Sequence, residues 1–128
     1  MAKNLRSVAL SEGTRIAPRA FYGLSRVTAI TLPDSVTAIG SNAFARTGLV
    51  EFSLPASLLC LEPQVFYRSA NLAIIRIRRT TAPIVVLKND NAFTGTNLRS
   101  IFVPTTMHFF EYDSAPSWRN FRDFLRIS

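Results

Sequence analysis

A short pattern recurs along this chain, and it constrains the possible folds more than any other feature of the sequence. Each occurrence has the form apolar-x-x-apolar-x-apolar, and a clear example ends in proline: Leu49-Val50-Glu51-Phe52-Ser53-Leu54-Pro55. The occurrences start at residues 5, 27, 49, 72 and 98, so the spacings are 22, 22, 23 and 26 residues. A dipeptide ending in Phe follows at a nearly fixed offset, as Ala20-Phe21, Ala43-Phe44, Val65-Phe66 and Ala92-Phe93. Self-similarity at a period of this length predicts a solenoid of stacked repeats.

The first half of each repeat predicts a strand, because its apolar and variable residues alternate as they do when one face is buried. Proline ends this strand, and a second short extended piece follows, such as residues 36–39. Gly40 then supplies a turn before a single helical turn that points Phe44 inward. One coil cannot bury its own Phe and Leu side chains, so neighbouring coils stack. Helical hairpins are disfavoured, because each repeat is short and several carry an internal proline.

The charge of the chain favours anionic partners. Its 128 residues carry a formal net charge of +7, and 13 of the 15 basic residues are Arg. A field of this sign attracts nucleic acid, acidic glycans and acidic protein surfaces without selecting among them. The alternative is that basic side chains only keep an apolar chain soluble. The length fits one domain, and 48% hydrophobic residues exclude a disordered chain.

The inventory of reactive side chains does not favour an enzyme. The single cysteine, Cys60, allows no intrachain disulfide and no multi-thiolate metal site, and its neighbours Leu58, Leu59 and Leu61 predict a buried position. The single histidine, His108, lies beside two Phe residues and is expected to contribute to a C-terminal cap. No glycine-rich phosphate loop and no HExxH or CxxC motif occurs. We therefore expect no catalytic residue, no metal and no cofactor.

The frame at residues 49–55, together with Ile39-Gly40-x-x-Ala43-Phe44, resembles the BspA-like subclass of leucine-rich repeats. The resemblance covers nearly the whole chain and includes a tail with Thr81-Ala82-Pro83, Tyr112 and Trp118. It departs from the family where a cysteine often follows the Phe dipeptide, since these positions hold Thr47, Ser69 and Thr96. The resemblance implies a non-catalytic binding or adhesion role in a bacterial surface or secreted protein.

The frames and the resemblance together predict a leucine-rich-repeat solenoid that is mainly β. We expect a right-handed coil with parallel strands on the concave face, and short second strands and single helical turns on the other side. One domain, residues 1–128, is divided into repeats at 5–26, 27–48, 49–71, 72–97 and 98–128, the last with a cap at 105–128.

The tail predicts a short capping helix over residues 117–127. Trp118, Phe121 and Leu125 share one helical face, while Arg119, Arg122 and Arg126 share another. Terminal coils need such a cap because their core would otherwise be wet. No equivalent cap precedes residue 5, so the N-terminal edge is expected to be open and to pair in a homodimer; the residues expected near this contact are Val8, Leu10, Ile16 and Phe21.

Strand alternation predicts which side chains lie on the strand face. The middle outward column is Ala9, Thr31, Ser53, Arg76 and Phe102, and it is flanked by Ser7, Ala29, Glu51, Ile74, Ser100 and by Ser11, Pro33, Pro55, Arg78, Pro104. Arginine and aromatic side chains dominate interface energies. The predicted ligand-binding patch is Arg76, Arg78, Arg79, Phe102, Ile74 and Glu51. The alternative is that Arg76 pairs with Glu51 across the sheet and the cap shields Phe102.

A second basic column, Arg26, Arg46 and Arg68, is predicted on the turns after the Phe dipeptides. It could hold an anionic polymer, but the sequence shows no interleaved aromatic residues, so nucleic acid is disfavoured as a partner. The predicted function is therefore a binding module that contacts protein or glycan through the strand face. The alternatives are a purely structural end piece of a longer repeat protein and a basic surface for an anionic polymer. Residues 1–4 show no secretory signal, and no apolar run is long enough to span a membrane.

Overall fold

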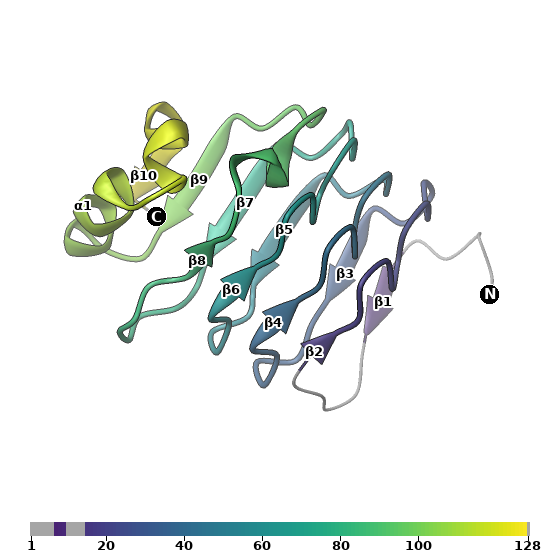
Figure 1. Ribbon diagram of the computed structural model, residues 1–128, viewed down its shortest axis with the longest axis horizontal. Helices are drawn as coiled ribbons and strands as arrows, with labels where there is room; N and C mark the ends of the chain where they lie inside the picture. The colour runs from purple at the N-terminus through teal and green to yellow at the C-terminus, as the bar shows by residue number, and fades with distance from the viewer. Residues whose placement is uncertain (1–6, 10–14, 128) are drawn as a thin grey trace.

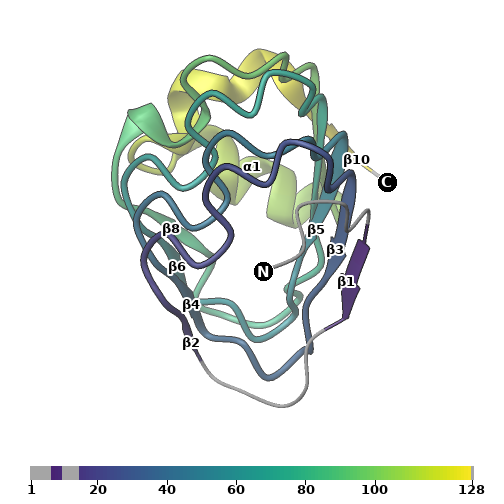
Figure 2. The ribbon, with the colours of Figure 1, turned by 90° about the vertical axis from the view of Figure 1, so that its right-hand side faces the viewer.

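The chain is a stack of coils in a computed structural model that describes residues 7–9 and 15–127 (Figure 1). The first strand of each coil lies on one side of the stack, and the second strand lies on the opposite side (Figure 2). The first strands are β1 (Ser7–Ala9), β3 (Ala29–Thr31), β5 (Glu51–Leu54), β7 (Ile74–Ile77) and β9 (Ser100–Val103). The second strands are β2 (Arg15–Ile16), β4 (Ala38–Ile39), β6 (Cys60–Leu61) and β8 (Val86–Leu87). Parallel strands and few helices confirm the predicted mainly β solenoid.

The strands pair in the register that the repeat frame predicts. Glu51 lies opposite Ile74, and Ile74 lies opposite Ser100, so equivalent frame positions are neighbours across the sheet. Pro55 and Pro104 each follow the last residue of a first strand directly, since a residue without an N–H cannot extend the ladder. The first-strand face is nevertheless interrupted. β1 and β3 form one pair, while β5, β7, β9 and β10 (Leu125–Ile127) form a separate four-stranded sheet.

A column of stacked Phe rings fills the core. Phe44 and Phe66 are fully buried, with ring centroids 5.9 Å apart and planes inclined by 16°. Phe21 stacks on Phe44 at 5.3 Å, and Phe93 stacks on Phe66 at 5.7 Å. Each ring follows the small or valine residue of its dipeptide, so the repeat period places one ring on each of the first four coils. The column ends at Phe121 in the cap, which meets Phe93 edge-on at 5.3 Å.

These rings are held in place by tight turns, which follow the second strand of each coil. Each of two turns has a pair of left-handed residues four positions apart, Asn42 and Arg46 in one and Gln64 and Arg68 in the next. The turns stack through backbone bonds, since Phe44 N–H donates to the Val65 carbonyl at 2.9 Å. Gly40 precedes the turn as predicted, but its role is close packing: a Cβ there would lie 2.6 Å from the backbone nitrogen of Pro18.

The residues three positions after the Phe of each dipeptide have hydroxyl groups in the second, third and fourth repeats, and Thr47 and Ser69 form a buried polar network. The Ser69 and Thr47 hydroxyls both donate to the Phe44 carbonyl, at 2.6 Å and 3.1 Å. The Thr47 N–H donates to the Ser69 hydroxyl at 3.1 Å. Thr96 repeats the arrangement by donating to the Phe93 carbonyl at 2.8 Å. These hydroxyls supply donors to the Phe44 carbonyl and a second donor to the Phe93 carbonyl, which also accepts from the Thr96 N–H at 3.2 Å.

The C-terminal cap is present, but its helix is not where the sequence predicted it. The helix α1 spans Thr106–Ser114 and begins after Thr105, whose hydroxyl accepts from the His108 N–H at 3.3 Å. The predicted helix over residues 117–127 is wrong, since η2 (Trp118–Phe124) is a kinked 3-10 segment that leads into β10. Trp118 and Leu125 are buried as expected. The tail becomes extended because β10 pairs with the open edge of β9, where Leu125 lies opposite Ile101.

Two aromatic side chains bind the cap to Val85, the residue just before strand β8. The Tyr112 hydroxyl accepts from the Val85 N–H at 2.9 Å, and Trp118 Nε1 donates to the Val85 carbonyl at 2.7 Å. Both rings are buried and meet edge-on at 5.3 Å. Burial raises the pKa of Tyr112 to about 12. The cap therefore covers the end of the core and also satisfies both backbone polar groups of Val85.

The predicted burial of residues 58–61 is correct only in part. Leu58 and Leu61 are fully buried, but Leu59 is 40% exposed and Cys60 is half-buried. Only two residues of this segment form strand β6, so the inward positions are three apart rather than two. In the described part of the chain, no helix is both long enough and apolar enough to cross a bilayer.

Candidate functional site

The strand face shows the columns that the sequence predicts. Ser53 lies opposite Arg76, and Arg76 lies opposite Phe102, so these middle-column residues are direct neighbours on adjacent strands. Thr31 and Ser53 are exposed, while the Arg76 and Phe102 side chains are half-buried. The face therefore changes along the stack, from small polar side chains on β3 and β5 to large ones on β7 and β9.

Arg76 is held by its two neighbours. Its Nε donates to the Glu51 carboxylate at 2.6 Å, which is the cross-strand pair expected under the structural alternative. Its guanidinium carbon lies 4.7 Å from the centre of the Phe102 ring. Arg76 itself thus covers part of Phe102, and Ile74 beside it is also half-buried. An exposed ion pair contributes about 0.2–1 kcal/mol and a cation–π contact about 0.5–1 kcal/mol, so this trio is ordered rather than strongly stabilising.

Arg78 crosses the sheet to an acidic residue that the sequence prediction did not include. Its Nη1 and Nη2 donate to the two Asp34 oxygens at 2.8 Å and 3.5 Å. Asp34 Oδ1 also accepts from the Ala56 N–H at 3.4 Å, so one carboxylate links three consecutive coils. The link bridges the side of the stack where β3 and β5 are not paired.

Arg79 is turned toward backbone carbonyls of its own lengthened repeat and of the preceding coil. Its guanidinium donates to the carbonyls of Pro83 at 2.6 Å, Ala56 at 3.2 Å and Ala82 at 3.4 Å. Each of the three arginines in the predicted patch therefore has partners within the chain. Such contacts fix the direction of a guanidinium while leaving part of it open to solvent.

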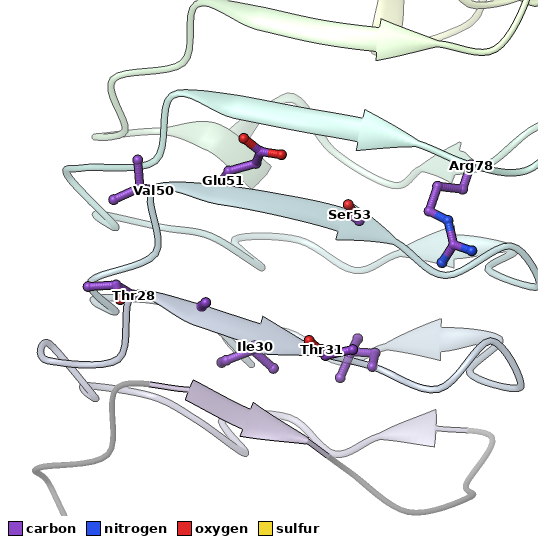
Figure 3. A pocket seen from close by; sticks show the side chains of 9 residues that line it. Thr28, Ile30, Thr31, Val50, Glu51, Ser53 and Arg78 are labelled. Carbon is purple, nitrogen blue, oxygen red and sulfur yellow. The ribbon is translucent and has the colours of Figure 1, made fainter. Parts of the chain in front are cut away.

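A hollow of about 470 Å³ lies on the strand face, over the break between β3 and β5 (Figure 3). It is lined by Thr28, Ala29, Ile30, Thr31, Leu32, Val50, Glu51, Ser53 and Arg78. The side chains on the floor of the hollow are small or apolar, and Glu51 and Arg78 supply opposite charges on its walls. The sequence placed Glu51 and Arg78 in the patch but missed the floor. The missing signal was the interrupted pairing, which the repeat frame does not reveal.

The two residues with catalytic potential do not meet requirements for nucleophilic chemistry. Burial, followed by the nearby Glu62 carboxylate, raises the pKa of the Cys60 thiol, which disfavours the reactive thiolate. His108 has both ring nitrogens occupied, by the Thr105 hydroxyl at 2.7 Å and the Thr80 carbonyl at 3.2 Å. It holds the start of α1 against the neighbouring loop, which places it in the cap.

Stacked coils of parallel strands, joined by tight turns and closed by a cap, define a solenoid repeat protein. A comparison with protein families matches residues 1–115 to six copies of the BspA type leucine rich repeat region. The chain belongs to this family of leucine-rich repeats, which confirms the resemblance found in the sequence. Membership indicates a protein-interaction or structural repeat module.

A solved structure gives the same fold. A leucine-rich repeat protein from Bacteroides ovatus superposes with a TM-score of 0.65 at 20% identity, over 77% of this chain and 25% of that one. The T. pallidum leucine rich repeat protein gives a TM-score of 0.49 at 24% identity, over 77% of this chain and 59% of that one. The chain therefore spans a quarter of the first protein and less than two thirds of the second. A comparison with curated proteins found no match.

Proposed function

We propose that this chain is a non-catalytic binding module of a bacterial surface or secreted protein, and that it contacts a protein ligand through the strand face. The hollow between β3 and β5 supports this proposal most directly. It offers a floor of small and apolar side chains at one side of the ordered trio Arg76, Glu51 and Phe102. This combination of a recess with adjacent arginine and aromatic side chains is typical of interface centres.

A protein is favoured over a glycan at this face because the lining is mixed rather than uniformly polar. Ala29 and Val50 are exposed and contribute apolar surface to the recess, while the buried Ile30 and Leu32 form its base. A ligand's aliphatic side chain gains free energy there by leaving water. Glu51 and Arg78 then provide one acceptor and one donor group to orient the ligand. Their existing partners reduce the side-chain entropy that binding would cost.

The experiment compares three variants against immobilised extracellular-matrix proteins and acidic glycans. In Thr31→Gln/Ser53→Gln, two exposed strand-face side chains fill the hollow without changing the charge. In Arg76→Ala/Arg78→Ala/Phe102→Ala, the wall and the adjacent stack are removed. The control is Val86→Arg on β8, which is 51% exposed on the opposite sheet. We expect both strand-face variants to lose protein binding while the control keeps it. Equal binding by all three would exclude the strand face.

The second candidate is a structural end piece of a longer repeat protein, in which other repeats carry recognition. The chain spans only 25% of the Bacteroides ovatus protein that it superposes on, and its cap covers the last coil. Under this proposal the isolated chain binds no member of the same ligand panel, whereas a longer protein containing it does. Binding by the isolated chain that depends on the hollow would contradict this alternative.

A further inference from the structure

The turns that follow the second strands (β2, β4, β6 and β8) form a surface without carboxylates. We define the turn ridge as residues 19–24, 42–47, 64–69 and 91–96. It contains Arg19, Arg46 and Arg68 and, in sequence, no Asp or Glu. All three arginine residues are exposed, and no ion pair to them occurs in the described ranges 7–9 and 15–127. The ridge is therefore a positive surface with no internal counter-charge.

Backbone bonds hold the segments of the ridge side by side. The Gly23 N–H donates to the Ala45 carbonyl at 2.9 Å, the Arg46 N–H to the Tyr67 carbonyl at 2.8 Å, and the Arg68 N–H to the Thr94 carbonyl at 2.8 Å. Arg46 and Arg68 are therefore neighbours on adjacent coils, with Gly23 and Gly95 at the equivalent flanking positions. Arg26 is exposed but lies outside this column, so the column predicted from the sequence is corrected at its first member. Gly23 occupies the position of Arg46 and Arg68, two residues after the Phe, and Arg26 follows three residues later.

Aromatic residues do interleave with these arginines, contrary to the sequence prediction. The Arg19 guanidinium lies 4.6 Å from the centre of the Tyr22 ring, and the Arg68 guanidinium lies 5.8 Å from that of Tyr67. Tyr22 is 38% exposed, and the fully buried Ala45 separates the two tyrosine positions. Tyr67 and Arg68 are adjacent in the sequence, whereas Arg19 and Tyr22 are three residues apart, so the turn brings that second pair together.

The backbone supplies an independent observation. Arg46 and Arg68 have φ of 56° and 57°, a left-handed conformation that side chains with a Cβ adopt at a cost. The equivalent residues of the flanking coils are Gly23 and Gly95, which have φ of 79° and 80° and avoid this cost. Arg68 is also built in, because a Cβ on Gly95 would lie 2.9 Å from its Cγ. Local strain of this kind is concentrated at functional sites.

We propose that the turn ridge binds a linear acidic glycan, with one sugar per coil. Stacked coils advance by about 4.8 Å, which is close to the advance of one sugar along an extended pyranose chain. A tyrosine ring offers a flat apolar surface for the C–H face of a sugar, and the guanidinium beside it pairs with a sulfate or carboxylate substituent. Tyr22 and Tyr67 are two coils apart, so they would contact alternate sugars.

Nucleic acid fits the same ridge less well. Duplex recognition requires a helix or a two-stranded ribbon that enters a groove, and the ridge consists of tight turns. Single-stranded nucleic acid requires successive stacking platforms, whereas here the buried Ala45 interrupts the series between the two tyrosine positions. The glycan is therefore the partner that the geometry favours.

The test measures binding of a heparin oligosaccharide to the full chain by titration calorimetry, with single-stranded DNA of similar charge as the comparison ligand. Arg46→Gly/Arg68→Gly restores the residue that the flanking coils have, so it should fold and melt no lower than the native chain. We expect it to bind heparin about tenfold more weakly or worse, with a salt slope lower by about two. Arg99→Gln/Arg119→Gln removes the same charge from exposed positions outside the ridge and should change affinity far less.

Tyr22→Leu/Tyr67→Leu separates the glycan from nucleic acid, because it removes both rings and no charge. We expect weaker heparin binding with an unchanged salt slope. Equal losses for the two arginine variants would overturn the proposal, since net charge alone would then explain binding. Tighter binding of DNA than heparin, with the larger tyrosine effect on DNA, would replace the glycan by nucleic acid. If Arg46→Gly/Arg68→Gly does not fold, Arg46→Asn/Arg68→Asn provides the same test, since Asn tolerates this conformation.

Discussion

Replacing Phe66 by alanine should reveal how much of the stability depends on the ring column. Phe66 is fully buried, stacks on two rings at 5.9 Å and 5.7 Å, and meets Phe52 edge-on at 5.3 Å. Loss of a buried Phe costs about 3–5 kcal/mol, and each favourable ring pair adds about 0.5–1.5 kcal/mol beyond burial. We therefore expect Phe66→Ala to lower the free energy of unfolding by about 5 kcal/mol.

Phe21→Ala provides the matched comparison at the end of the column. Phe21 is half-buried and has one ring neighbour, Phe44 at 5.3 Å. With about half of the burial and one ring pair, it should cost about 2 kcal/mol. The difference between the two variants, about 3 kcal/mol, tests the position in the stack because the chemical change is the same.

Urea unfolding followed by circular dichroism measures both values, and Trp118 fluorescence reports on the cap in the same experiment. A domain has only about 5–15 kcal/mol of stability, so Phe66→Leu, expected to cost about 1.5 kcal/mol, covers the case in which the alanine variant unfolds. The slope of free energy against urea must stay constant, since a repeat protein can otherwise unfold in parts. Equal costs at Phe21 and Phe66 would refute this account and would mean that another surface covers Phe21.

Three further outcomes are expected. The pKa of Tyr112 is about 12 in the folded protein against an ordinary value of 10.0. Its contribution to the free energy of unfolding is therefore complete below pH 10 and should be lost between pH 10 and 12, by at most about 3 kcal/mol. Tyrosinate absorbance should show one of the three tyrosines ionising last, and simultaneous ionisation in the folded protein would contradict this. Gly48→Ala should lower the free energy of unfolding by about 2 kcal/mol or more, measured by thermal unfolding, because its Cβ would lie 2.3 Å from the Ser25 carbonyl oxygen. Gly23→Ala should lower it by only about 1 kcal/mol, because Gly23 has open space around it and its cost comes from the φ of 79°. Sedimentation should show a dimer at high concentration that Phe21→Ala weakens; a monomer up to millimolar concentration would exclude pairing of the first coils.

The structure describes three of the four residues that this dimer prediction names. Ile16 is buried, and Phe21 is half-buried against the core, as expected for an incompletely covered first coil. Strand β1 pairs with β3, which places Val8 opposite Ile30. Leu10 lies outside the described residues, as do the residues before β1. The homodimer therefore remains a prediction.

The strand face shows which contacts a sequence can predict. The pairing of Arg76 with Glu51 followed from the repeat frame, since the two residues occupy neighbouring columns on adjacent strands. The Arg78 bond to Asp34 did not, because it spans 44 residues and skips one coil. Two of the three carbonyls that Arg79 contacts, those of Ala82 and Pro83, lie in its own lengthened loop, whose conformation no repeat pattern specifies.

By itself, the sequence determined the periodic part of this protein. Strand alternation, terminal prolines and Phe dipeptides are local signals, and repetition makes each one confirm the next, so the solenoid, the columns and the inward rings follow from them. Only the tertiary structure decided the break between β3 and β5, the conformation of the tail, and the contacts of Arg19 with Tyr22 and of Arg68 with Tyr67 on the turn ridge. Residues 117–127 have helical spacing of apolar side chains, yet the unpaired edge of β9 draws residues 125–127 into a strand. Backbone hydrogen bonding to that edge outweighs a weak local preference, because its donors and acceptors exist only once the last coil has formed.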